Sequence, residues 1–241
     1  MLGAGLGTAV VRASEDDDGR ATAADSGPGL GTQRILWSGA HAVALTFDDG
    51  PDPDLTPPLL DLLARRGLPA TFLLIGARAE EHPDLVRRAV DAGHELGNHT
   101  WSHRSLATLD RDEVHRELER TAEVLPHPVR WFRPPDGVLT GAGAQIAAEH
   151  HYDVLLWSAS ASPRSLRTPV EVAKHVDRDL RLGTVLCMHD GLGRAGFSRW
   201  RATVDAMRKR RAMELSALPR ILDEALDRGV RFVTASELAA G

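Results

Sequence analysis

The sequence VALTFDDGP, residues 43–51, joins a short apolar run to two adjacent carboxylates, Asp48 and Asp49. The apolar part is bounded by turn residues, which predicts a strand buried in a parallel sheet. Two carboxylates directly after such a strand are costly to bury unless they are paired or bind a metal ion. The alternative is a solvated turn favoured by Gly50 and Pro51. The stretch therefore indicates a sheet with a candidate polar site at one edge.

Further apolar segments along the chain are also predicted to be strands, and helical patterns separate most of them. They are Thr71–Ile75, Glu95–Gly97, Val129–Phe132, Asp153–Trp157, Thr184–Met188 and Val230–Val233. Strands that alternate with helices indicate a parallel sheet, and the number of units is short of the eight of a closed barrel. We therefore expect an α/β fold, a distorted (β/α)7 barrel, with its chemistry at the carboxyl ends of the strands.

Capping residues predict where the helices begin. Thr56 is expected to be an N-cap, Asp110 to open a capping box for a helix that reaches Leu125, and Thr168 to precede another helix. The apolar spacing over Ser216–Asp227 predicts the last long helix.

The first 34 residues differ from the rest of the chain. Residues 1–14, MLGAGLGTAVVRAS, resemble the end of an export signal without its charged beginning, and an acidic, Gly-rich linker follows them. We expect residues 1–34 to be a flexible tail or the remnant of such a signal, and residues 35–241 to form one catalytic domain. Localisation is therefore open between the cell envelope or outside, if the signal is real, and the cytoplasm.

Composition excludes several classes of function. Lysine and arginine number 29 against 34 aspartates and glutamates, so no bulk positive field favours nucleic acid. Cys187 is the only cysteine, which excludes an intramolecular disulfide and a zinc site built on several thiolates. No apolar run reaches the ~20 residues of a membrane-spanning helix.

Reactive side chains follow five of the predicted strands. They are Asp48 and Asp49, then His99 and His103, then Arg133, then Ser158 and Ser160, and finally His189 and Asp190. Because the carboxyl ends of parallel strands meet at one edge, we expect these groups to lie near one another.

The spacing of His99 and His103 places both rings on one face of a helical turn, which suits one metal ion. Eleven histidines in this chain give roughly half of one such pair by chance, so the pair alone could be a surface feature. A nearby carboxylate changes the interpretation, because two histidines and one carboxylate with open positions are typical of a catalytic metal site.

Arg133 and His189 have chemical and structural interpretations of similar weight. A guanidinium at a strand end can hold a catalytic carboxylate bidentately and keep it ionised, or it can form an ordinary salt bridge. A histidine at a strand end can be a general acid, or it can be a hydrogen-bonded core residue. Cys187 is interpreted as a buried apolar filler.

Four motifs, taken together and in order, resemble the polysaccharide deacetylases, the NodB-homology or carbohydrate esterase family 4 enzymes. They are Thr46–Pro51, Asn98–His103, Phe132–Pro135 and His189-Asp190. The resemblance covers residues 35–241 and implies a distorted barrel, a divalent metal ion that is usually zinc but can be cobalt or another ion, and removal of an N-acyl group from an amino sugar or polysaccharide.

The resemblance also implies a role for each matching residue. The implied metal ligands are Asp49, His99 and His103; the implied catalytic residues are the general base Asp48, its partner Arg133 and the general acid His189. The resemblance further implies that the backbone N–H of Asp136 stabilises the oxyanion. It also implies that Trp101 and Pro135 contact the substrate.

The chain departs from the family pattern in several places. Asp136 stands where an aromatic residue is common, and Cys187 stands where the family has leucine. The D-x-x-D-W motif is missing near Ser160–Arg164, so we expect His189 to lack the usual carboxylate partner unless Asp190, Asp153 or the Asp177–Asp179 helix supplies one. A basic segment after His189 is interpreted either as a solvated helix face or as a lid or patch for an anionic substrate; it contains Arg199, Arg201, Arg208, Lys209, Arg210 and Arg211.

Two alternatives to a polysaccharide deacetylase stay open. One is an amidase or deformylase of the same fold that acts on small molecules, which the missing aromatic residues favour. The other is a non-catalytic carbohydrate-binding domain, which a degraded site would favour. The expected partner in the enzyme interpretations is an N-acylated carbohydrate or a small amide, without nucleic acid and without a stable membrane span.

Overall fold

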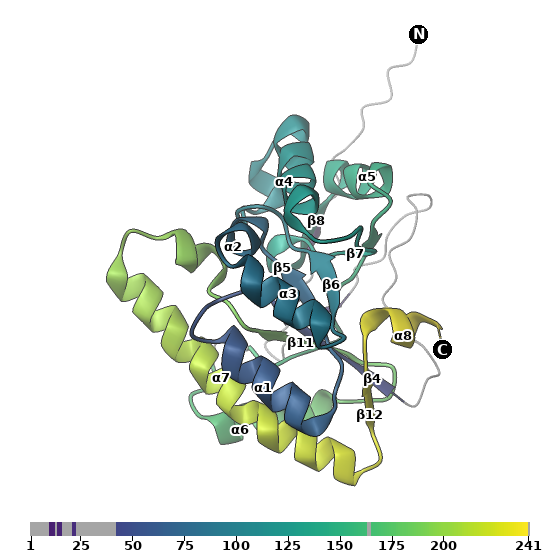
Figure 1. Ribbon diagram of the computed structural model, residues 1–241, viewed down its shortest axis with the longest axis vertical. Helices are drawn as coiled ribbons and strands as arrows, with labels where there is room; N and C mark the ends of the chain where they lie inside the picture. Colours follow the sequence, from purple (N-terminus) through teal and green to yellow (C-terminus); the bar gives the residue numbers. More distant parts are fainter. Residues whose placement is uncertain (1–9, 13, 16–20, 23–41, 163–164, 241) are drawn as a thin grey trace.

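The strand that opens the first motif lies in the middle of the sheet (Figure 1). The structure is a computed structural model, and it describes residues 10–12, 14–15, 21–22, 42–162 and 165–240. This strand, β4 (Ala42–Asp48), is buried over its whole length. It pairs with β11 (Val185–His189), with β12 (Arg231–Val233) through its first residues and with β5 (Thr71–Leu74) through its last. Asp48 and His189 are directly opposite in this register, so the sheet itself brings two predicted site residues together.

The rest of the sheet extends outward from these strands. Beyond β5 lie β6 (Glu95–Asn98), β7 (Trp131–Phe132) and β9 (Asp153–Val154), and beyond β11 lies β10 (Ala159–Ser160). Every pairing in this sheet is parallel. The curled parallel sheet with helices around it confirms the distorted (β/α)7 barrel predicted from the sequence. β10 is an addition that the apolar pattern did not predict.

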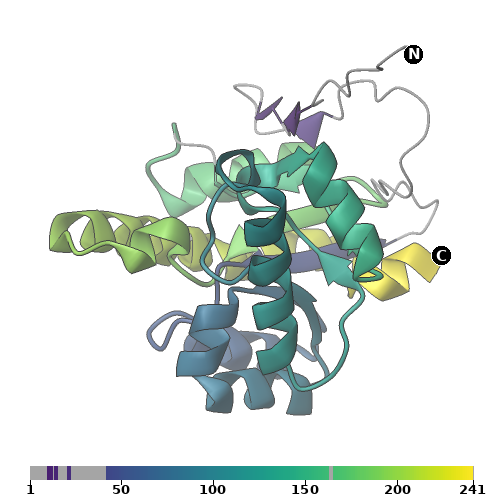
Figure 2. The ribbon, with the colours of Figure 1, turned by 90° about the horizontal axis from the view of Figure 1, so that it is seen from above.

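Eight α-helices surround the sheet in the described residues (Figures 1 and 2). They are α1 (Thr56–Arg66), α2 (Gly76–Glu81), α3 (Pro83–Asp91), α4 (Arg111–Val124), α5 (Gly141–Glu149), α6 (Pro169–Asp179), α7 (Arg201–Asp227) and α8 (Ala235–Ala240). Short 3-10 turns cover Leu106–Thr108, Pro135–Gly137 and Gly193–Phe197, and β8 (Val138–Thr140) lies outside the main sheet. The helices bury apolar faces against the sheet, as where Leu59 and Leu63 join Phe47 and Phe72 in the main core.

The predicted helix starts are confirmed at two of three positions. Asp110 and Thr168 both form complete capping boxes, with a glutamate three residues later returning the hydrogen bond. Thr56 is not an N-cap: it is the first helical residue, and Leu55 precedes it. Its hydroxyl instead accepts a hydrogen bond from the backbone N–H of Asp52 and donates one to the side chain of Asp190.

The last long helix begins earlier than the sequence pattern predicts. α7 spans 27 residues from Arg201, so the predicted start at Ser216 is wrong. Its C-terminal half carries the apolar residues that pack on α6, whereas its N-terminal half is mostly exposed and extends past the neighbouring elements (Figure 2). The exposed half lacks a continuous apolar stripe, which is why periodicity did not reveal it.

Most of the predicted tail, residues 1–34, lies outside the described residues. Where it is described, β1 (Val10–Arg12) pairs antiparallel with β8, and β2 (Ser14–Glu15) pairs with β3 (Ala21–Thr22). Among the described residues, no helix combines the length and apolar character that crossing a bilayer requires.

Candidate active site

A cavity of about 490 Å³ opens at the carboxyl edge of the sheet and brings the predicted reactive residues together. Asp48 and Asp49 enter it from the end of β4, His99 and His103 from the loop after β6, and His189 from the end of β11. Arg133 follows β7 and lies fully buried behind Asp48. The four motifs therefore meet in one place, as the order of parallel strand ends predicted.

The backbone around the cavity is held in uncommon conformations. Asp49, His103 and Asp136 have positive φ values of 76°, 53° and 55°, in the left-handed region that non-glycine residues rarely adopt. Such positions persist where surrounding contacts over-determine them, and they cluster at functional sites. A close approach enforces one of them: Gly191 packs so tightly on the backbone carbonyl of Asp49 that a Cβ atom would overlap it. These turns aim the side chains of Asp49 and His103 into the cavity.

Asp49, His99 and His103 form a group suited to one metal ion. Oδ1 of Asp49 lies 3.1 Å from Nε2 of His103 and 3.5 Å from Nε2 of His99, and all three side chains are nearly inaccessible to solvent. Burial acts to raise the pKa of Asp49, but the charge of His103, the close approach of both imidazole rings and the charge of Arg211 hold it well below its usual value. The carboxylate is thus ionised and faces two imidazole nitrogens.

Outer contacts orient these three side chains. Nδ1 of His99 lies 2.7 Å from the backbone oxygen of Arg133, so that nitrogen donates and Nε2 is left as the ligand atom. Arg211 donates from Nη2 to Oδ2 of Asp49 at 2.9 Å, which reserves Oδ1 for the centre of the group. Oδ1 itself is buried and accepts no well-aligned hydrogen bond in the described part of the chain. Two imidazoles, which bind metal ions in their neutral form, and one oriented carboxylate fit a divalent cation with open coordination positions.

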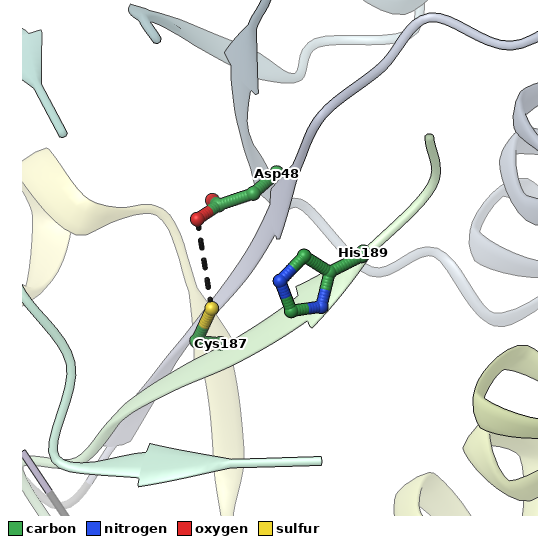
Figure 3. A group of neighbouring side chains, drawn as sticks. All are labelled: Asp48, Cys187 and His189. Atoms are coloured by element: carbon green, nitrogen blue, oxygen red, sulfur yellow. Dashed lines mark hydrogen bonds between the residues drawn. The ribbon is translucent and has the colours of Figure 1, made fainter. Parts of the chain in front are cut away.

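Asp48 is held for a different task. Arg133 donates from Nη1 to Oδ1 of Asp48 at 2.5 Å and to Thr46 at 3.0 Å. The guanidinium therefore contacts the carboxylate through one nitrogen, not bidentately as the sequence suggested. Oδ2 of Asp48 faces the cavity, 3.6 Å from Sγ of Cys187 (Figure 3). Asp48 thus offers one oxygen to Arg133 and the other to the cavity.

Cys187 lines the cavity and is more than the buried filler that the sequence indicated. Asp48, Cys187 and His189 are also close enough to hold an ion (Figure 3). However, burial and the charge of Asp48 raise the pKa of the Cys187 thiol well above its usual value, so it remains a protonated donor. A thiol must be deprotonated to bind a metal well, which favours the Asp49 group as the metal site.

His189 has the carboxylate partner that the sequence analysis expected it to lack. Nδ1 of His189 lies 3.0 Å from Oε1 of Glu214, a buried residue of α7. The expectation of a missing partner is therefore wrong, and the alternatives Asp190, Asp153 and Asp177–Asp179 are wrong too. Because Nδ1 contacts the carboxylate, Nε2 is the nitrogen available for proton transfer in the cavity.

Arg211 and Glu214 form one buried ion-pair network on α7. Arg211 contacts Oε2 of Glu214 at 3.1 Å, the hydroxyl of Ser162 at 2.9 Å and the backbone oxygen of Gly191 at 3.1 Å. Burial acts to raise the pKa of Glu214, but the charges of His189 and Arg211 and hydrogen bonds from His189 and Ser162 hold it at about 2. Arg211 thus links the metal group, through Asp49, to the partner of His189.

Sequence reasoning missed three functional neighbours: Glu214, Ser162 and Trp157, which lines the cavity. Glu214 lay before the predicted start of its helix and far from any motif. Arg211 was noted only as part of the basic segment, whose interpretation as a solvated face is wrong for Arg211, because Arg211 is buried. Arg208 is partly exposed and pairs with Asp52 and Asp54. A signal was present: Arg211 and Glu214 are spaced i, i+3, as an ion pair on one helix face requires.

The residues predicted to contact the oxyanion or the substrate do not all lie at the cavity. Asp136 lines the cavity, and the role of its N–H stays a prediction. Trp101 lies under the guanidinium of Arg120, 3.6 Å from the ring centroid, and neither it nor Pro135 lines the cavity, whereas Pro134 does. The geometry therefore does not support substrate contact by Trp101 or Pro135.

Several known proteins are similar to this chain in sequence. Residues 38–155 match the family model described as polysaccharide deacetylase. A peptidoglycan-N-acetylglucosamine deacetylase of Bacillus cereus is 35% identical over 215 residues, covering 86% of this chain and 93% of the relative. A chitooligosaccharide deacetylase of Sinorhizobium fredii is also 35% identical, over 80% of this chain and 89% of its own.

A solved structure is similar as well. The crystal structure of a peptidoglycan N-acetylglucosamine deacetylase in complex with 4-naphthalen-1-yl-N-oxidanyl-benzamide superimposes with a TM-score of 0.70 at 29% identity. The match covers 83% of this chain and 88% of that one.

Proposed function

The chain belongs to the polysaccharide deacetylase family, carbohydrate esterase family 4, and from this premise we propose that it deacetylates N-acetylglucosamine units in a peptidoglycan or chitin-type chain. It is a hydrolase of the N-acetyl carbon–nitrogen bond. The observation that carries the proposal is the meeting of the Asp49–His99–His103 group, the Asp48–Arg133 pair and the His189–Glu214 pair around one cavity.

The residues divide the proton transfers between two sides of the cavity. Asp48 accepts a proton from the attacking water at its cavity-facing oxygen, while Arg133 fixes the other oxygen. His189 delivers a proton from Nε2 to the leaving amine, while Glu214 holds Nδ1. Water thus gives its oxygen to the acetyl carbon, the carbon–nitrogen bond breaks, and acetate and a free amine result.

A divalent ion bound by Asp49, His99 and His103 supplies Lewis-acid polarisation of the acyl oxygen. We assign zinc to this site, with cobalt as the main competitor, because imidazole and carboxylate ligands suit both ions. The compound in the solved relative is a hydroxamic acid by its name, and hydroxamic acids chelate metal ions, which supports metal dependence for that protein. The backbone N–H of Asp136 is assigned to the same oxygen.

The alternatives are less well supported by the cavity. An amidase for small molecules was favoured by missing aromatic residues, but one aromatic residue, Trp157, is among those that line the cavity. A non-catalytic domain requires a degraded site, whereas base, acid and ligand candidates are all in place. A polymeric cell-wall substrate also favours the cell envelope or the exterior as the place of action.

The test is a panel of N-acetylglucosamine oligomers, peptidoglycan fragments and small amides, assayed for acid or amine release with and without added zinc. Zinc-dependent acetate release from the sugars is expected. His99→Ala should lose bound metal, measured by elemental analysis, together with activity, because it removes a ligand. Release from small amides alone would refute the substrate, and full metal content in the variant would refute the ligand assignment.

A further inference from the structure

One face of α7 connects the acid side of the cavity to the surface of the protein. Glu214, which contacts His189, lies at one end of this face, and Arg210, Met207 and Thr203 follow toward the helix start at helical spacing. Thr203 and Glu214 are eleven positions apart, which corresponds to about 16 Å along the helix. The helix therefore presents a track from the reacting centre outward.

A groove of about 510 Å³ follows this track. It is lined by Ala202, Thr203, Ala206, Met207 and Arg210. Met207 and Arg210 also line the active-site cavity, so the groove and the cavity adjoin at these two side chains. An occupant that passes over them and fills both has one end in the catalytic centre.

The chemistry of the groove suits a neutral sugar chain better than an anion. Two alanines leave room on the helix surface, and Met207 offers an adaptable apolar contact. Among the described residues, Arg210 is the one cation that lines the groove, and it already donates to the backbone oxygen of Ser162. The neighbouring cations Arg208 and Arg211 are used in ion pairs with the protein's own carboxylates.

An exposed aromatic ring lies at the outer end of the track. Trp200 is the N-cap residue of α7 and is 66% exposed. Aromatic side chains with one apolar face and a polar surrounding are typical of ligand contacts. Sugar rings present C–H faces to such side chains and hydroxyls to guanidinium groups.

We propose that the glycan chain beyond the reacting sugar lies along the N-terminal half of α7, in the groove from Met207 to Ala202, with Trp200 as its outer contact. The occupant is a β-linked chain of N-acetylated sugars, and this inference rests on the proposed function. α7 then makes the enzyme favour long chains over short ones.

The test compares the dimer and the hexamer of β-1,4-linked N-acetylglucosamine as substrates of the zinc-loaded enzyme. Ala206→Gln fills the groove with an uncharged side chain at an exposed helix position, and Trp200→Ala removes the outer contact. Ala212→Gln is the matched control, because Ala212 is exposed on the same helix outside the groove. The hexamer-to-dimer ratio of kcat/KM should fall about tenfold in the first two variants and stay constant in the control.

Binding of the hexamer to the metal-free protein, measured by calorimetry, keeps the inference testable without turnover. Ala206→Gln should weaken this binding about tenfold, and Ala212→Gln should not. Hexamer binding without acetate release from any sugar would refute the proposed function but support the groove. An unchanged ratio and unchanged binding in Ala206→Gln would refute the groove. The groove would also be refuted as a glycan site if the only effect of Ala206→Gln were to convert a dimeric protein into a monomer. In that case a second copy of the chain would be the occupant of the groove.

Discussion

Replacing Glu214 by glutamine is expected to shift the basic limb of the pH–rate profile to lower pH. Glu214 places a negative charge 3.0 Å from Nδ1 of His189, and His189 must be protonated to donate to the leaving amine. The substitution keeps the shape and an acceptor oxygen, but it removes the charge that favours the imidazolium. The protonated acid then becomes scarce at a lower pH.

The size of the shift follows from the surrounding charges. An opposite charge at hydrogen-bond distance moves a proton equilibrium by about 1–3 pH units. Arg211 lies 3.1 Å from the other oxygen of Glu214 and shares its charge, so we expect the smaller effect, a loss of about 1.4 kcal/mol, or roughly tenfold in kcat/KM, on the basic side of the profile. Losing one carboxylate from the buried Arg211 should also destabilise the fold by roughly 3 kcal/mol.

The assay is kcat/KM for acetate release from an N-acetylglucosamine oligomer between pH 5 and 10, on enzyme loaded with zinc. Glu95→Gln is the control, because Glu95 accepts hydrogen bonds from Thr71, Trp131 and Ser236 at the opposite end of its strand. That variant should lose stability without moving the limb. If Glu214→Gln lowers the rate equally at every pH, Glu214 is only structural and the reasoning fails.

Three further predictions concern the turns around the metal group. Asp48→Asn should abolish turnover and keep the metal, whereas Asp49→Asn should weaken metal binding by about 10–100-fold, measured by chelator competition; equal affinities would contradict the division of roles. Burial and the neighbouring carboxylates raise the pKa of Asp190 to about 7, although a hydrogen bond from Thr56 opposes them. The protonated form of Asp190 is therefore favoured in the folded state. Its contribution to the free energy of unfolding is complete below about pH 4 and is lost as the pH rises through 7. In the metal-free protein, the free energy of unfolding measured with urea should therefore fall between pH 4 and pH 7, and Asp190→Asn should remove up to about 4 kcal/mol of this fall. If the free energy of unfolding depends on pH in the same way in the variant, the prediction is wrong. Gly191→Ala should destabilise the fold by more than about 2 kcal/mol, because the new Cβ overlaps the carbonyl of Asp49; a melting temperature like that of the unsubstituted protein would contradict this clash.

The sheet and most of the residues at its edge follow from local features of the sequence. Strand β4 was predicted because a continuous apolar run between turn residues has a local physical cause, which is burial on both faces. The same logic located Asp49, His99 and His189, since parallel strands end at one edge whatever their distances in the chain. The capping boxes at Asp110 and Thr168 were predictable because each depends on only four consecutive residues.

The groups that support the reacting residues are selected by long-range packing of the chain. Glu214 is 25 positions from His189, on a stretch of α7 whose exposed start has no apolar periodicity, so no local pattern marks it as a partner. Only the packing of α7 against β11 brings it to the ring, and the same packing inserts Arg211 between Asp49 and Glu214. A buried charge requires a partner of opposite charge, but any carboxylate that packing brings close enough can be that partner. The sequence around the charge therefore does not identify which carboxylate it is.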